Sequence, residues 1–143
     1  MPKKINFQFL ISYLGLIPYV LTFLDKYYFL IVEEEQLLSF ITYYSLIIIV
    51  FTGSINWNLK NNPPTHIVIY GFLPSLFAVM IIVLSLFNIK ILIIFILITL
   101  LLLTQLFFDY IILFANEINK KVFYFLRLPL TFLIIIFLLL ISL

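Results

Sequence analysis

The residues best suited to chemistry lie on one predicted helix in the last third of the chain. Gln105, Asp109, Ile112, Asn116 and Lys120 follow one another at intervals of four, three, four and four residues. This spacing places them on one helix face. A carboxylate within an apolar membrane helix costs roughly 2.5–3.5 kcal/mol at the bilayer centre, so it normally faces other helices or water and has a partner. The face therefore predicts a cation beside Asp109.

Arg127 is the cation that we expect to meet Asp109. Asp109 lies about six residues before the predicted hairpin ANEINKK, and Arg127 lies about five residues after it. Two antiparallel helices joined by a short loop bring such positions to the same depth, so we predict an ion pair. The pair is bidentate if the guanidinium fork is free to align. It either fastens two helices together or, with Gln105, forms one side of a binding pocket.

A second group of scarce residues lies at the end of another apolar run. The stretch FTGSINWNLKNNPPTH, residues 51–66, holds one of the three glycines, the only tryptophan and the only histidine. Gly53 lies one turn before Asn56, so a neighbouring helix can come close and the amide can hydrogen-bond across the contact. Trp57 is placed where an interfacial aromatic residue is expected. A lone histidine makes no metal site, so we interpret His66 as a surface residue.

A third group lies in the next apolar run. Gly71 and Ser75 are four residues apart and offer a small surface for close helix approach. Pro74 lies between them and leaves the carbonyl of Tyr70 without its helical N–H partner. We therefore predict that Gly71, Pro74 and Ser75 pack against another helix or line the pocket.

Pro129 is expected inside the last helix. If that helix began at Pro129, its 15 residues would measure only about 22 Å, short of the roughly 30 Å hydrocarbon core. The helix must therefore start near Val122, and Pro129 leaves the carbonyl near Phe125 without a partner. Such a carbonyl needs a donor within a membrane, which Arg127, Tyr124 or a water can supply.

The helices that position these groups are defined by composition. Only 10% of the 143 residues are charged, and the mean hydropathy is +1.31, whereas about 25% charged residues is usual for a soluble domain. A chain of this length allows one domain, and spanning a membrane takes roughly 20 apolar residues. The sequence predicts an all-α membrane protein, a bundle of five transmembrane helices in a single domain over residues 1–143. The five predicted spans are residues 6–24, 37–57, 67–87, 89–114 and 122–143.

The positive charges predict an orientation. Six Lys and Arg residues fall on the side of the N-terminus and two on the other side, which places the N-terminus on the cytoplasmic or matrix side and the C-terminus opposite. The basic N-terminal run lacks a small-residue cleavage site, so we interpret it as a retained first span. The acidic run at residues 33–35 is expected as a solvated loop. A bacterial inner membrane and a mitochondrial inner membrane both fit this multi-pass topology.

Four motifs in order resemble a known family. YYSLIIIVFTGSINWNL, YGFLPSLFAV, LTQLFFDYIIL and FYFLRLPLTFLIII are similar to the landmarks of the transmembrane protein 69 family (domain of unknown function 3429). The resemblance implies a five-helix membrane protein of proteobacteria or mitochondria. A histidine commonly precedes the tryptophan of the second span in that family, and Asn56 stands there in this chain. Because an amide cannot titrate, this position is not expected to bind a metal or haem or to carry protons.

The sequence argues against catalysis. It contains no Ser/His/Asp set, no zinc-protease motif and no Gly-rich phosphate loop, so we expect neither an enzyme nor a metal or cofactor site. The absence of cysteine excludes disulfides and thiolate ligands. A net charge of +2 with scattered lysines does not indicate a nucleic-acid partner.

Two functional hypotheses remain. The leading one is an accessory subunit or assembly factor of a larger energy-transducing, respiratory-type membrane complex, with membrane lipids and other membrane-protein subunits as partners. Its partner surface should include the aromatic residues Tyr43, Tyr44, Phe107 and Phe108. The alternative is a small carrier, channel or lipid- or quinone-binding protein. Its pocket in the inner leaflet would be lined by Asn56, Trp57, Ser75, Gln105, Asp109 and Arg127.

Overall fold

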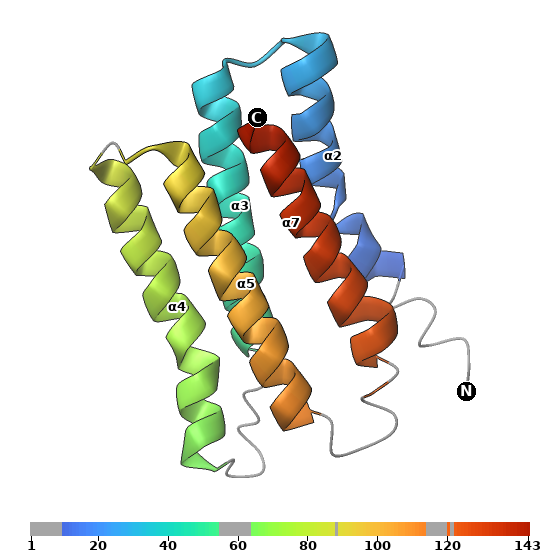
Figure 1. The fold of residues 1–143 in the computed structure, drawn as a ribbon, viewed down its shortest axis with the longest axis vertical. Coiled ribbons are helices and arrows are strands. Elements are labelled where there is room, and N and C mark those ends of the chain that lie inside the picture. Colours follow the sequence, from blue (N-terminus) through green and yellow to red (C-terminus); the bar gives the residue numbers. More distant parts are fainter. Residues whose placement is uncertain (1–9, 55–63, 88, 114–119, 121) are drawn as a thin grey trace. The chain divides into compact units, whose positions relative to one another are not determined.

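The computed structural model describes residues 10–54, 64–87, 89–113, 120 and 122–143. The secondary structure of these residues is entirely helical, without a strand, as the sequence predicted (Figure 1). Residues 10–14 are helical as well. The labelled elements are α2 (Ile17–Leu24), η1 (Asp25–Phe29), α3 (Glu34–Ser54), α4 (Thr65–Leu86), α5 (Ile91–Leu113), η2 (Phe123–Arg127) and α7 (Leu128–Ser142). The two segments η1 and η2 are π-helical.

Four of the described helices are long and apolar enough to cross a membrane. They are Glu34–Ser54, Thr65–Leu86, Ile91–Ile111 and Phe123–Ser142. At about 1.5 Å per residue these lengths match a hydrocarbon core of roughly 30 Å. Four of the five predicted spans therefore correspond to helices of the expected length. The side of the membrane on which each terminus lies stays a prediction.

The first predicted span is interrupted. Residues 10–14 are helical, Gly15 and Leu16 form a turn, and α2 begins at Ile17. Pro18 lies in the first turn of α2, where its missing N–H is tolerated, but the same proline cannot continue a helix arriving from residue 14. The described part of the predicted span over residues 6–24 is therefore not one continuous helix, and the fifth crossing stays a prediction.

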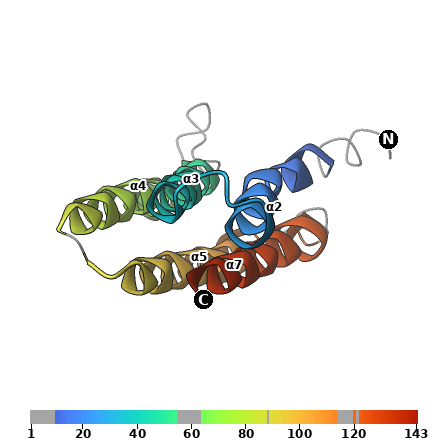
Figure 2. The same cartoon turned by 90° about the horizontal axis from the view of Figure 1, so that it is seen from above.

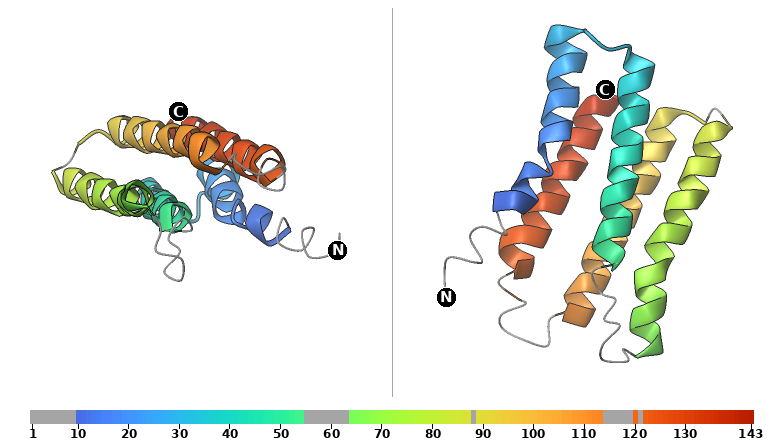
Figure 3. Two further views of the ribbon diagram at one scale, coloured as in Figure 1. Left: turned by 90° about the horizontal axis from the view of Figure 1, so that it is seen from below. Right: turned by 180° about the vertical axis from the view of Figure 1, so that it is seen from behind.

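The chain divides into two compact units, and the first combines Met1–Leu38 with Leu103–Leu143. In this unit α2 and α7 lie side by side, although they come from opposite ends of the sequence (Figures 1, 2 and 3). Tyr19 of α2 is fully buried and stacks on Phe137 of α7, with ring centroids 6.4 Å apart. Phe23, one turn further on, meets the same ring at 6.3 Å. Aromatic contacts thus join the first part of the chain to its last helix.

The second unit is Ser39–Leu102. It contains most of α3, all of α4 and the first half of α5, and α4 and α5 run antiparallel (Figure 1). Ile41, Ile49, Ile81 and Ile98 are almost completely buried. The expectation of a single domain over residues 1–143 stays a prediction.

Candidate functional site

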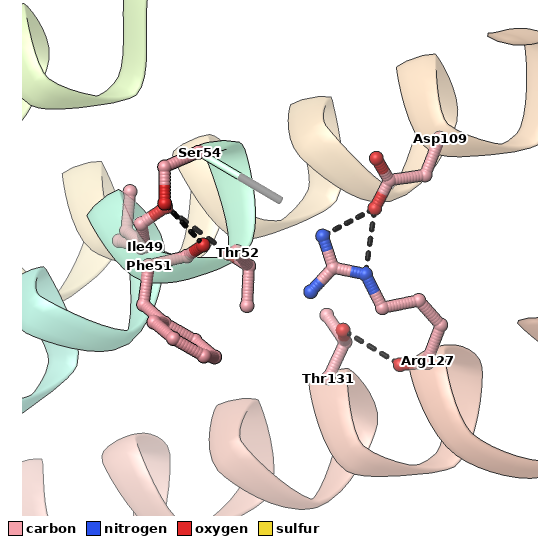
Figure 4. A network of polar contacts seen from close by, with 7 residues as sticks. All are labelled: Ile49, Phe51, Thr52, Ser54, Asp109, Arg127 and Thr131. Carbon is pink, nitrogen blue, oxygen red and sulfur yellow. Dashed lines mark hydrogen bonds and ion pairs between the residues drawn. The ribbon is translucent and has the colours of Figure 1, made fainter. Parts of the chain in front are cut away.

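Asp109 and Arg127 form an ion pair. The side chain of Asp109, on α5, is 0% exposed, and that of Arg127, the last residue of η2, is 21% exposed. Arg127 Nε donates to Asp109 Oδ2 at 2.7 Å, and Arg127 Nη2 contacts the same oxygen (Figure 4). The expected pair is therefore present, but its form differs from the fork–fork arrangement. Two guanidinium nitrogens converge on one carboxylate oxygen.

The backbone around Pro129 positions Arg127. Pro129 lies in the first turn of α7 and offers no N–H to the carbonyl four residues before it. The preceding turn is π-helical and ends at Arg127, whose own carbonyl accepts a 2.8 Å hydrogen bond from Thr131 Oγ1 (Figure 4). The chain is already helical at Val122, where the sequence predicted the start of the last helix.

The donor for the carbonyl of Phe125 is a residue that sequence reasoning missed. Tyr13 Oη donates to Phe125 O at 2.8 Å, across 112 residues of sequence. The predicted donors were Arg127, Tyr124 or a water, and the prediction was wrong because it considered only the same helix and solvent. No local pattern connects Tyr13 with Pro129. The sequence indicated only that Pro129 leaves the Phe125 carbonyl without its helical N–H, so that some donor was required.

Gln105 lies one turn before Asp109 on the same buried face of α5. Leu102 and Gln105 are each 5% exposed, and Asp109 follows at the expected interval. Lys120 is exposed. The side chain of Ile112 and all of Asn116 lie outside the described residues, so the full predicted face is seen only in its first half.

The residues predicted near the end of the second span are described in part. Gly53 is buried within α3. Thr52 and Ser54 beside it each donate to a carbonyl of their own helix, Thr52 to Ile49 O at 3.1 Å and Ser54 to Phe51 O at 2.9 Å (Figure 4). Asn56 and Trp57 lie outside the described residues, so their predicted roles stay predictions.

Gly71, Pro74 and Ser75 lie in the middle of α4. Gly71 and Pro74 are buried, and the half-buried Ser75 donates from Oγ to Phe72 O at 3.0 Å. Burial of the small residues agrees with a packing role. These residues and Gly53 belong to the unit Ser39–Leu102, whereas Asp109 and Arg127 belong to the other unit. A pocket shared by the two groups therefore stays a prediction.

A second polar cluster, which the sequence did not reveal, lies at the C-terminal end of α7. Lys26 Nζ donates to Ile141 O at 2.6 Å and pairs with Glu34 Oε1 at 3.0 Å. Tyr27 Oη donates to Leu140 O at 2.7 Å. The last carbonyls of a helix have no intrahelical partner, and a cation there is favoured by the helix dipole. The sequence offered only two signs of this cluster, the uncapped end of the last apolar segment and the lysine that follows the first one. These residues are 115 positions apart.

The polar groups of the site satisfy one another. Within the described part of the chain, no buried side-chain nitrogen or oxygen lacks a hydrogen-bond partner. The same residues contain no group of three His, Asp or Glu side chains able to hold a metal ion. The hydroxyls of Thr22, Ser45 and Thr131 each bond a carbonyl one turn earlier on their own helix. These hydroxyls therefore meet their hydrogen-bonding needs within their own helices.

The comparisons with known proteins give one result. A family model described as Protein of unknown function (DUF3429) matches residues 6–143. No curated protein and no solved structure matches the chain. The link to transmembrane protein 69 stays a prediction.

Proposed function

This chain belongs to the DUF3429 family, whose description names no activity, and from its geometry we propose that it is a non-catalytic subunit or assembly factor of a larger membrane complex. An energy-transducing complex of the respiratory type is the first to test, because the resemblance seen in the sequence includes proteobacterial and mitochondrial proteins. In this role the chain contributes surface and stability, and its ion pair holds helices in place.

The satisfied interior is the observation that carries this proposal. A binding or catalytic site normally presents a few polar groups that converge on an empty space. Here the described buried side chains use their polar atoms on one another or on the backbone. Asp109 is fully buried, and two nitrogens of Arg127 are engaged by one of its oxygens. The charged groups of Asp109 and Arg127 therefore bind each other within the chain.

The exposed surface supports the same proposal. α4 carries large apolar side chains along its length, and many of them are at least 39% exposed. They include Val68, Ile69, Phe72, Leu73, Leu76, Phe77, Val79, Met80, Val83 and Leu86. Three of the four predicted partner positions, Tyr43, Phe107 and Phe108, are also exposed. Such surfaces suit lipid or the helices of another subunit, because van der Waals packing drives helix association within a membrane.

A lipid or quinone carrier is the second candidate. The observation in its favour is Arg127, which keeps 21% of its side chain exposed although it is paired with a buried carboxylate. A basic group at the membrane surface can bind an anionic headgroup. Under this hypothesis the purified chain is stabilised by its ligand, whereas a subunit depends on its partner.

The test is purification from native membranes in a gentle detergent, followed by native gel electrophoresis and mass spectrometry of the band. We expect the 16.9 kDa chain to migrate with a larger complex. Phe107→Ala should weaken this association, and Phe125→Ala serves as the matched control, since the two side chains are 62% and 69% exposed. Migration of the wild-type chain alone, with thermal stabilisation by added lipid or quinone, would exclude the subunit proposal in favour of the carrier.

A further inference from the structure

A run of six consecutive large apolar residues is exposed between α2 and α3. The run, here called the apolar loop, comprises Tyr27, Tyr28, Phe29, Leu30, Ile31 and Val32. The exposed fraction ranges from 42% at Val32 to 80% at Ile31. In water such a run would carry a large cost in apolar surface, so its exposure indicates a surrounding that is not water.

The apolar loop lies at the level where the neighbouring helices end. Tyr27 Oη bonds the carbonyl of Leu140, and Lys26 Nζ bonds that of Ile141, both in the last turn of α7. α3 begins at Glu34, directly after the loop. The spans Glu34–Ser54 and Phe123–Ser142, the second of which comprises η2 and α7, are long enough to cross the hydrocarbon core, so their ends mark the boundary between acyl chains and headgroups.

Three backbone amides of the apolar loop are bonded by a single residue. Leu30 N donates to Asp25 O at 2.7 Å, Ile31 N donates to Asp25 Oδ1 at 3.3 Å, and Val32 N donates to Asp25 Oδ2 at 3.0 Å. Irregular backbone in water needs no such partners, because water supplies them. In lipid each unsatisfied N–H costs several kcal/mol.

Leu30 shows that this arrangement has a cost. Its φ of 52° and ψ of 38° lie in the left-handed region, which is unfavourable for a residue with a Cβ. The conformation turns the chain so that the next two amides reach the Asp25 carboxylate. The loop accepts local strain and thereby gains internal hydrogen-bond partners.

We infer that the apolar loop is an interfacial anchor, which inserts its side chains into the headgroup–acyl boundary of a bilayer. Tyrosines are enriched at this level, and the amides closed by Asp25 allow the backbone to enter it. Four carboxylates, at Asp25 and residues 33–35, surround the loop, and the one cation among them, Lys26, is paired with Glu34. These charges disfavour anionic headgroups, so the lipid that fits is zwitterionic. A second protein would be an alternative cover for the same side chains.

The experiment places a single fluorophore on the apolar loop. Trp57, the only tryptophan, is replaced by Phe, and Ile31→Trp is introduced, since Ile31 is the most exposed residue of the loop. The protein is reconstituted in phosphatidylcholine vesicles with bromine on the upper part of the acyl chains. Glu33→Trp and Phe72→Trp in the same background give the references for water and for the middle of a lipid-facing helix.

We expect the Ile31→Trp emission to be shifted to the blue relative to Glu33→Trp and to be quenched by the brominated lipid. Iodide in the water should quench it weakly. Quenching by iodide as strong as for Glu33→Trp would place the loop in water and overturn the inference. Protection from both quenchers would show a protein cover and would overturn it as well.

Substitution of Asp25 tests the part of the inference that concerns the backbone. With Ile31→Trp as reporter, Asp25→Ala should lose most of the lipid quenching and gain quenching by iodide, because the freed amides now need water. Glu35→Ala, at an exposed acid in the first turn of α3, is the control and should change neither. Asp25→Asn keeps one acceptor oxygen and should give an intermediate result. Unchanged quenching in Asp25→Ala would contradict the claim that the Asp25 hydrogen bonds allow the loop backbone to enter the lipid.

Discussion

At the scale of single residues, the Asp109–Arg127 pair joins α5 to the turn before α7, and we expect its net contribution to stability to be small. Two charges lose hydration when they are buried, and their attraction often only balances that loss. Removing one partner is different, because the other charge then loses the opposite charge that balances it. Since Asp109 is 0% exposed, we expect removal of Arg127 to destabilise the protein more than removal of Asp109.

Arg127→Ala should therefore destabilise the protein by about 3–5 kcal/mol, the range for an uncompensated buried charge. The double variant Asp109→Leu/Arg127→Met removes both charges at similar volume and should recover most of the loss. The measurement is thermal or SDS-induced unfolding of both variants in the same detergent. If the double variant were as unstable as Arg127→Ala, the loss of stability could not be explained by an uncompensated buried charge.

Tyr13→Phe should cost about 0.5–1.5 kcal/mol, the usual net value of one hydrogen bond, because the Phe125 carbonyl loses its donor. In a Pro129→Ala background residue 129 regains an N–H for that carbonyl, so the same substitution should cost little. The double-mutant cycle is measured by unfolding in detergent. Equal costs of Tyr13→Phe in both backgrounds would show that Tyr13 does not compensate for the proline.

The sequence predicted the ion pair but not the long-range hydrogen bonds of Tyr13, Lys26 and Tyr27. The ion pair followed from counting residues on either side of one hairpin, which is a local argument. Tyr13, Lys26 and Tyr27 could not be found in that way, because their partners lie 112 to 115 residues away. Nothing in a single sequence pairs a phenol in the first helix with one particular carbonyl in the last.

At the scale of elements, each π-helical segment carries a cation next to one end of α7. Lys26 belongs to η1 and meets the end of α7, whereas Arg127 ends η2 directly before α7 begins. A π-turn holds one more residue than an α-turn and changes the direction of every side chain after it, and such turns are frequent at functional sites. The contacts of α7 at its two ends therefore depend on two local departures from α-helical geometry.

The apolar runs predicted four helices to within a few residues, since continuous hydrophobicity over about 20 positions is a strong signal. The break at Gly15 and Leu16 and both π-turns were missed, because hydropathy is the same whether a backbone is α-helical, π-helical or turned. Pro18 and Pro129 each lie where such a departure meets an α-helix. A proline inside an apolar run was the available sign, and it indicates a junction without specifying its type.

Lys26→Met should loosen the last turn of α7. The substitution keeps the apolar stem and removes the ammonium that bonds the Ile141 carbonyl, and a hydrogen bond to a charged group contributes about 1.5–3 kcal/mol. Hydrogen–deuterium exchange should be faster for the amides of the last turn of α7 and unchanged in α4. Lys90→Met, at an exposed lysine, is the control. Equal exchange in both variants would show that Lys26 does not hold the end of this helix.

At the scale of the whole molecule, the remaining question is how often the chain crosses the membrane. Four of the helices in the described residues are long enough, and the interrupted first helix decides between an even and an odd number of crossings. Charge distribution predicts an odd number, with the termini on opposite sides. Helix lengths alone cannot decide this, because a short helix continued by a turn can still reach across a bilayer.

The absence of cysteine makes this topology directly measurable. Single cysteines are introduced as Lys3→Cys, Lys120→Cys and Leu143→Cys and are labelled in intact cells with a membrane-impermeant maleimide. We expect Leu143→Cys to react from outside, and Lys3→Cys and Lys120→Cys to react only after permeabilisation. Reaction of Lys3→Cys on the same side as Leu143→Cys would mean that the first helix does not cross.

The contact between α2 and α7 also has a consequence for biosynthesis. Lys26 leaves the ribosome 115 residues before Ile141, which corresponds to a delay of roughly 6–23 s at about 5–20 residues per second. Throughout that interval the ammonium of Lys26 and the ring of Tyr19 have no α7 to bind, and the phenol of Tyr13 lacks the Phe125 carbonyl of η2. The nascent chain must therefore be sheltered in the membrane until its last helix arrives, and a ribosome that stalls before α7 would release a first unit that cannot close.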